Sequence, residues 1–193
     1  MEDNNINDLN KMQGLLNLRQ HAEILLIPVL KDFNVIDSAN PQSILIARST
    51  DNAFLEQVIA DGPLMDGETF EDRIQLVIDR LQLFLQNDPN NCKESNCFYY
   101  KDYQTKDFEY KIYIQDFVIK REDGQKLITR MANAFFVEPR FNDFYQISLA
   151  VGPFNFSTDV LKLGEVDCEN DAISNALMTM FEIILDLTKY RDE

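Results

Sequence analysis

The candidates for chemistry in this chain are four polar residues in an apolar region, namely Tyr113, Asp116, Arg130 and Asn133. A carboxylate such as Asp116 can serve as a general acid or base, and tyrosines on the same sheet can help to line a ligand pocket. We therefore treat the four residues as candidates for contact with a ligand or a partner. We assign no catalytic residue.

These residues lie on two apolar runs that are separated by Glu122-Asp123-Gly124-Gln125. The Asp-Gly pair reaches positive φ at low cost and typically closes a tight hairpin between antiparallel strands. A loop made of this pair alone predicts that Asp116 lies opposite Met131 and diagonal to Asn133.

The predicted position of Asp116 and Asn133 is on the more apolar face of the hairpin, where an unpaired carboxylate is costly. Two explanations remain open. Either a loop or the rim of a helix layer supplies polar partners, which is the commoner case, or the face opens into a ligand pocket. On the other face, the same register places Phe117 opposite Arg130 in a structural cation–π contact.

Residues 97–154 contain aromatic-rich runs separated by short polar breaks, which predicts an antiparallel sheet of about four to six strands. Both faces of the central hairpin are largely apolar in this register. A sheet with one solvated face alternates more cleanly, so helices are expected on each face. The predicted fold class is α+β, an antiparallel sheet covered by helices on both faces in an α/β/α sandwich.

Two amphipathic helices are predicted to cover this sheet. The first follows Thr69, a predicted N-cap with Asp72 at the third helical position, and runs to Asp88. Its apolar stripe comprises Phe70, Ile74, Val77, Ile78, Leu81, Phe84 and Leu85. The second helix runs from about Asp171 to Tyr190.

The segments before these helices are predicted from shorter patterns. Apolar spacing indicates a helix over residues 6–25, as an N-terminal extension over 1–23 of a single domain spanning 1–193. Because Pro28 interrupts this pattern, residues 24–33 form either the helix end or a short strand. Residues 43–48 predict a buried strand, and Asp51 is predicted to cap a short helix that ends at 61–63.

The net charge of −15 arises from 33 acidic and 18 basic residues. Residues 51–95 hold ten acidic and three basic residues and residues 156–193 hold nine and three, whereas residues 96–155 hold eight of each. The negative potential disfavours nucleic acid and anionic membranes, and it favours a basic protein partner. A solvated helix surface that only confers solubility explains the same charge.

Signatures of catalysis and cofactor binding are missing from the sequence. We find no glycine-rich phosphate loop, GxSxG or HExxH pattern. The chain has one histidine, His21, and three cysteines, Cys92, Cys97 and Cys168. We therefore expect no metal site and no cofactor, and an enzyme is the less favoured class. The acidic N-terminus lacks the pattern of a secretory signal, so we expect a cytoplasmic location with reduced thiols, although a processed secreted form remains open.

The order of elements resembles the PsbP-like α/β sandwich, including its DcrB-like bacterial branch. The stretches that carry the resemblance are SILIARSTD, ETFEDRIQLVIDRLQLFL, YKIYIQDFVIKREDGQKLITRMANAFFV and AISNALMTMFEIIL, within residues 24–187. The chain departs from the family in having no lipoprotein signal, no tryptophan and an added N-terminal helix. The resemblance implies a fold used mostly for docking to other proteins, and no catalytic residue carries over.

Two functional hypotheses follow. The preferred one is a non-enzymatic acidic module of the adaptor, secretion chaperone or toxin-neutralising type, which docks a basic or amphipathic protein partner. The alternative is a small-ligand-binding protein or carboxylate-based enzyme with a pocket on the sheet near Asp116.

Overall fold

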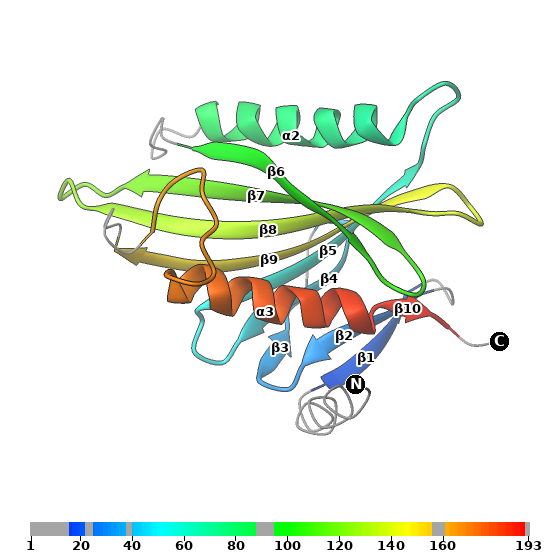
Figure 1. Cartoon of the computed structure of the whole chain (residues 1–193), viewed down its shortest axis with the longest axis horizontal. Coiled ribbons are helices and arrows are strands. Elements are labelled where there is room, and N and C mark those ends of the chain that lie inside the picture. The colour runs from blue at the N-terminus through cyan, green and yellow to red at the C-terminus, as the bar shows by residue number, and fades with distance from the viewer. Residues whose placement is uncertain (1–15, 22–24, 38–39, 88–94, 156–160, 192–193) are drawn as a thin grey trace.

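The computed structural model describes residues 16–21, 25–37, 40–87, 95–155 and 161–191 (Figure 1). Its first element is β1 (Leu16–His21), which pairs with β2 (Leu25–Leu30), and β10 (Lys189–Tyr190) completes a three-stranded antiparallel sheet. The predicted N-terminal helix is therefore wrong from Leu16 onward, and residues 1–15 lie outside the described part of the chain. Leu25, Ile27 and Val29 of β2 are buried on one face, and Pro28 between them is buried as well.

The larger sheet has seven antiparallel strands, which confirms the α+β class and exceeds the predicted strand number. Their order is β3 (Phe33–Val35), β4 (Ser43–Ser49), β5 (Phe54–Pro63), β9 (Asp143–Asn155), β8 (Lys126–Glu138), β7 (Glu109–Lys120) and β6 (Asn96–Gln104). The predicted strand over 43–48 corresponds to β4.

The short helix predicted after Asp51 is wrong, because this segment is strand β5. Phe54 and Val58 project from one face of β5, and Leu55 and Ile59 project from the other. Apolar residues on both faces of a strand produce neighbouring pairs along the sequence that resemble a helical stripe. The hydrogen-bonded neighbours β4 and β9 determine the outcome.

Helices α2 (Phe70–Asn87) and α3 (Ala172–Leu187) match the predicted segments closely. Thr69 and Asp72 form the expected reciprocal cap, with the Asp72 amide donating to Thr69 Oγ1 at 3.1 Å and the Thr69 amide donating to Asp72 Oδ2 at 3.0 Å. The predicted stripe of α2 is not buried throughout, since Phe84 is 68% exposed. Tyr190 lies beyond α3, in β10.

The apolar side chains of the two helices belong to different clusters. Leu177, Phe181 and Ile184 of α3 pack in the main core with residues of β2 and of the long strands. Ile74 and Ile78 of α2 pack with Phe135 and Phe144 in a smaller cluster. Neither described helix is long and apolar enough to cross a membrane.

The hairpin between β7 and β8 reverses at Asp123-Gly124 as predicted, but its register is shifted by one residue. Arg121 and Gln125 close a three-residue loop, in which the Arg121 amide donates to Gln125 O at 2.8 Å and Gly124 has φ of 83°. Asp116 is therefore opposite Arg130, where Met131 was predicted. A one-residue shift moves a strand's side chains to the other face relative to its partner.

Candidate functional site

The structure places Tyr113 opposite Asn133 on β7 and β8, and it brings the other two predicted site residues, Asp116 and Arg130, into direct contact. Both side chains are fully buried, and the Arg130 guanidinium donates to Asp116 Oδ1 at 2.7 Å and to Oδ2 at 2.8 Å. The predicted contact between Phe117 and Arg130 is wrong, because Phe117 pairs with Thr129. A bidentate pair of this kind is the strong form of a charged hydrogen bond.

The remaining polar groups around this pair also have partners. Arg130 Nη2 donates to the carbonyl of Lys162 at 2.9 Å, and Nη1 donates to Ser174 Oγ at 2.6 Å. The Gly164 amide donates to Asp116 Oδ2 at 3.2 Å. The network thus fastens the segment before α3 and the first turn of α3 to the sheet, and it supplies the structural partners that an interior carboxylate requires.

Asn133 and Tyr113 lie on the opposite face of the sheet, so the predicted neighbourhood of Asp116 and Asn133 is wrong. Asn133 Oδ1 accepts hydrogen bonds from Gln146 Nε2 at 2.9 Å and from Ser148 Oγ at 2.8 Å. The ring of Tyr113 packs edge-on between Tyr99 and Phe135. A ligand contact by any of the four residues stays a prediction.

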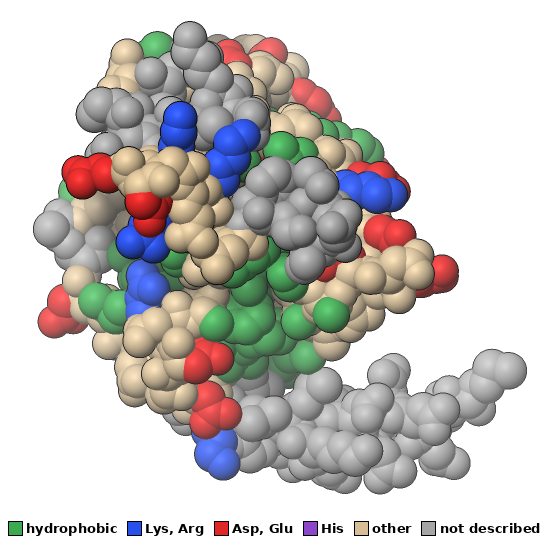
Figure 2. All heavy atoms as spheres, turned by 90° about the vertical axis from the view of Figure 1, so that its left-hand side faces the viewer, with side chains coloured by type: hydrophobic (Ala, Val, Ile, Leu, Met, Phe, Trp, Pro, Cys, Tyr) green, Lys and Arg blue, Asp and Glu red, His purple; other side chains and the backbone are tan. Residues whose placement is uncertain are grey.

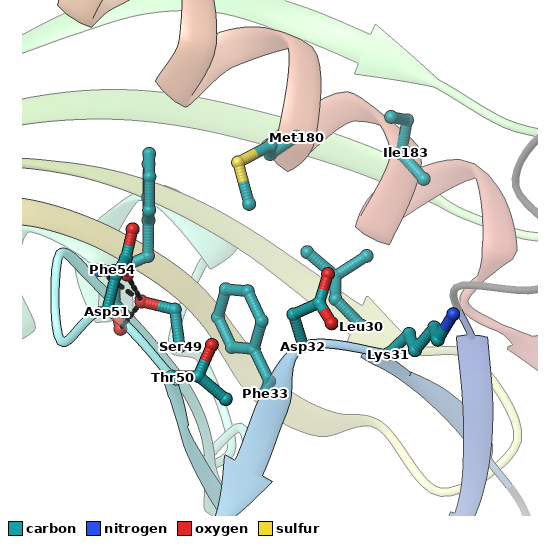
Figure 3. A pocket seen from close by; sticks show the side chains of 10 residues that line it. All are labelled: Leu30, Lys31, Asp32, Phe33, Ser49, Thr50, Asp51, Phe54, Met180 and Ile183. Atoms are coloured by element: carbon teal, nitrogen blue, oxygen red, sulfur yellow. Dashed lines mark hydrogen bonds between the residues drawn. The ribbon is translucent and has the colours of Figure 1, made fainter.

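A pocket of about 360 Å³ lies elsewhere, where α3 passes over the turns between β2 and β3 and between β4 and β5 (Figure 3). We call it the α3 pocket. Its lining residues are Leu30, Lys31, Asp32, Phe33, Ser49, Thr50, Asp51, Phe54, Met180 and Ile183. Figure 2 shows apolar side chains gathered in a hollow at the end of the molecule that is on the left of Figure 1.

The β4–β5 turn that forms one wall is organised by Ser49 and Asp51. The Ser49 hydroxyl donates to Asp51 Oδ1 and accepts from the Phe54 amide at 2.9 Å. The bond from Ser49 and a second one from the Ala53 amide at 3.0 Å hold the pKa of the exposed Asp51 below its ordinary value. Asn52 adopts φ of 59°, a left-handed conformation that asparagine tolerates better than most residues. The turn therefore has a defined shape, with its carboxylate at the pocket mouth.

The β2–β3 turn and α3 form the other walls. The Thr50 amide donates to the Asp32 carbonyl at 2.8 Å and so joins the two turns. In Figure 3 the Asp32 carboxylate points toward the space below Met180 and Ile183, whereas the Lys31 ammonium points away from it. The pocket therefore has apolar walls from Phe33, Phe54 and α3, and a negatively charged mouth.

Glu56 follows Phe54 by two positions on β5 and therefore projects from the same face of the sheet. It is fully buried between Ala47 of β4 and Leu149 of β9, and neither carboxylate oxygen has a hydrogen-bond partner among the described residues. Burial raises the pKa of Glu56 from 4.5 to about 8. Glu56 is therefore mostly a neutral acid at pH 7.

The site is suited to binding. Its lining residues include no histidine or cysteine, and the described residues contain no group of three His, Cys, Asp or Glu side chains that could hold a metal ion. Apolar walls with a few polar groups are typical of ligand and side-chain pockets. Cys97 and Cys168 are free thiols outside this pocket, and Cys92 lies outside the described residues.

Sequence reasoning missed this pocket and Glu56, because the residues 54–59 were predicted to be helical. A signal was present in the sequence. Ser49-Thr50-Asp51-Asn52 is a run of turn-forming residues between two apolar segments, which is typical of a hairpin. In a hairpin, Phe54, Glu56 and Val58 share one face of the strand. This arrangement predicts that the Glu56 carboxyl group lies among apolar neighbours.

The fold of this chain is similar to that of a solved structure. No protein-family model matches the chain, and no curated protein matches its sequence. The solution structure of cyanobacterial PsbP (CyanoP) from Synechocystis sp. PCC 6803 is similar, with a TM-score of 0.57 over 92% of this chain and 94% of that chain. The sequence identity is 7%, so this similarity shows the fold alone. The chain has a PsbP-like fold, as the order of its elements predicted.

Proposed function

We propose that this protein with a PsbP-like fold is a non-enzymatic binding module whose α3 pocket receives an apolar side chain of a basic or amphipathic protein partner. The observation that carries the proposal is an open apolar pocket with two exposed carboxylates, Asp32 and Asp51, at its mouth. The proposed module is of the adaptor, secretion chaperone or toxin-neutralising type.

The dimensions of the pocket support a side chain as its occupant. A volume of about 360 Å³ is at the lower end of the range of ligand pockets. It suits one large side chain and part of a neighbour. Protein interfaces draw most of their free energy from a few such anchors, which are usually aromatic or long side chains in desolvated pockets.

Charge supports a basic partner. The net charge of −15 attracts a cationic surface over a distance of about 10 Å at moderate salt. Such attraction mainly accelerates association and selects the partner. The apolar anchor then supplies the affinity.

Two finer expectations from the sequence belong to this proposal. We propose that α2 and α3 are outer layers on opposite faces of the sheet. The pocket then lies where α3 meets the β3–β4 edge. The protein works in the cytoplasm, where Cys97 and Cys168 remain reduced thiols. A pocket beside Asp116 is left out of the proposal, because both oxygens of that carboxylate already accept hydrogen bonds.

Selection from a random peptide library on the immobilised protein tests the proposal. We expect the enriched peptides to carry a large apolar residue next to lysine or arginine. Replacing Ile183 by tryptophan fills the pocket and should weaken these peptides at least about tenfold, the equivalent of one lost apolar anchor. Leu83→Trp is the matched control, since Leu83 is 60% exposed on α2 outside the pocket. Enriched peptides without an apolar anchor, or peptides that bind the Ile183→Trp variant equally well, would contradict the proposal.

A further inference from the structure

A buried glutamate gives the α3 pocket a chemistry that its apolar walls do not provide. Glu56 is completely buried, and both of its oxygens are without a hydrogen-bond partner in the described part of the chain. Interior polar groups are nearly always satisfied. An unsatisfied carboxyl group next to a cavity therefore points to a partner that arrives with the ligand.

The sheet places Glu56 directly behind the pocket wall. Glu56 follows Phe54 by two positions on β5, so both side chains project from the same face. Ala47, which pairs with Glu56, precedes Ser49 by two positions on β4. Phe54 and Ser49 line the pocket and Glu56 does not, so Glu56 lies just beyond the lining on the same face of the sheet. A group at the back of the pocket reaches Glu56 only when the half-buried Phe54 ring moves aside, and we include this movement in the inference.

We propose, on the basis of the binding function above, that the α3 pocket takes an apolar group carrying a primary ammonium and that Glu56 becomes its counter-ion. The ammonium belongs either to a small amine or to a lysine side chain of the partner. Binding converts the Glu56 carboxyl group to a carboxylate, and the proton that it loses goes to solvent. The ligand enters and stays as a cation.

The charges at the pocket mouth favour a cationic head group over an anionic one. Asp32 and Asp51 both lie there, and the one lining cation, Lys31, is turned away from the cavity in Figure 3. The residues that flank Glu56 on the sheet, Ala47, Leu149, Phe54 and Val58, carry no titratable group. The same holds for the α3 residues of the main core, Leu177, Met178, Phe181, Ile184 and Leu185.

Magnitudes favour the ammonium over a neutral hydrogen-bonding group. Since the pKa of Glu56 is about 8, removing its proton at pH 7 weakens binding about tenfold. Opposite charges about 4 Å apart at an effective dielectric constant near 20 strengthen binding by roughly a thousandfold, before the cost of removing the ammonium from water is subtracted. A neutral hydrogen bond contributes only about tenfold or less.

Three probes with the same apolar body and different head groups test this inference, namely 2-phenylethylamine, 2-phenylethanol and 3-phenylpropionate. Calorimetry at pH 7 in two buffers of different ionisation enthalpy gives both the affinity and the number of protons released. We expect the amine to bind at least about tenfold more tightly than the alcohol and to release close to one proton. The propionate should bind more weakly than either.

Glu56→Gln is the decisive variant, because glutamine has the shape of a protonated glutamic acid and preserves the core. It should remove the preference for the amine and keep the binding of the alcohol. Asp66→Asn is the matched control, since it deletes one exposed carboxylate that does not line the pocket, and it should leave the preference unchanged. The same comparison with the blocked dipeptides acetyl-Phe-Lys-amide and acetyl-Phe-norleucine-amide tests a lysine of a partner protein.

A preference that depends on Glu56 and appears only with the dipeptides assigns the ammonium to a partner lysine, and one that appears with phenylethylamine assigns it to a small amine. Equal binding of charged and neutral probes in both series, or a preference that survives in Glu56→Gln, overturns this inference. If the neutral probes still bind and Ile183→Trp blocks them, the proposed function stands without it. Failure of every probe to bind overturns both.

Discussion

Two carboxylates, Asp116 and Glu56, occupy the same face of the seven-stranded sheet in adjacent rows. Asp116 pairs with Arg130 in a row that continues through Val151 to Phe54. The next row crosses Ala132 and Leu149 and reaches Glu56. Both carboxylates are fully buried, so their depth does not distinguish them.

Their partners distinguish them completely. Asp116 accepts hydrogen bonds from the Arg130 side chain and the Gly164 amide, whereas Glu56 accepts none from the described residues. A buried charge with partners on every side fixes the fold around it. A buried acid without partners lowers stability whenever it ionises. The contrast teaches that partners, more than depth, separate a structural acid from a candidate for binding.

The largest effect is expected from breaking the satisfied pair. Asp116→Ala leaves the Arg130 guanidinium buried without its carboxylate, and removal of one partner from a buried pair typically costs about 3–5 kcal/mol of unfolding free energy. Urea denaturation measures the loss. The double variant Asp116→Ala/Arg130→Met is the control, because it removes the stranded charge and should recover a large part of the stability. A double variant no more stable than Asp116→Ala would contradict a structural role for the pair.

The unsatisfied acid should respond in the opposite direction. Between its ordinary pKa of 4.5 and its folded pKa of about 8, Glu56 holds a proton in the folded chain that the unfolded chain releases. The free energy of unfolding therefore falls as pH rises through this window. At pH 7 the loss of unfolding free energy is on the order of 3 kcal/mol, because each pH unit above the ordinary pKa of 4.5 costs about 1.4 kcal/mol until the folded pKa is reached.

Glu56→Gln removes this pH-dependent loss, so the variant should be more stable than the wild type at pH 7 and pH 8. The unfolding free energies of the two proteins should converge near pH 4.5. Urea denaturation at these three pH values measures the difference. Asp66→Asn, which deletes an exposed acid, should follow the wild-type pH dependence. Parallel curves for Glu56→Gln and wild type would show that Glu56 has a partner in solution.

The sequence predicted the satisfied acid only in part. Asp123-Gly124 correctly indicated a chain reversal, but the same dipeptide closes loops of two or three residues, and these differ in register by one position. The choice depends on pairing Asp116 with Arg130 beneath α3, which is a tertiary interaction. Opposite charges near the centre of both runs were the signal that would have corrected the register.

The unsatisfied acid was missed because local pattern and tertiary context disagree in β5. Phe54, Leu55, Val58 and Ile59 have a spacing that suits a helix as well as a two-faced strand. In contrast, the cap at Thr69 and the stripe of α3 were predictable, because capping and helical period are local properties. The α3 pocket combines residues 30–33, 49–54 and 180–183, and no local rule brings such distant segments together.

A smaller effect is expected where the satisfied network reaches the start of α3. Asp171 is the N-cap of this helix, and its Oδ1 accepts from the Ile173 amide at 2.9 Å while Oδ2 accepts from the Ser174 hydroxyl. Asp171→Ala should lower the unfolding free energy by about 0.5–2 kcal/mol, the usual value of an N-cap. Urea denaturation measures it, with Asp171→Asn as the milder control. Asp171 Oδ2 also lies 3.6 Å from Arg130 Nη1, so a loss as large as that of Asp116→Ala would mean that Asp171 compensates the Arg130 charge as strongly as Asp116 does.

The smallest effect is expected from a third acid, Glu182 of α3, which has a partner but lies near the surface. Lys101 Nζ donates to Glu182 Oε1 at 2.5 Å, and both side chains are 35% exposed. Water screens a pair at this depth, so Lys101→Met should change the unfolding free energy by at most about 1 kcal/mol. Methionine keeps the apolar contact of the lysine stem, whereas Lys101→Ala removes it and should cost more. A loss for Lys101→Met near that of Asp116→Ala in urea denaturation would contradict this expectation. It would mean that a partly exposed ion pair stabilises the fold as much as a buried one.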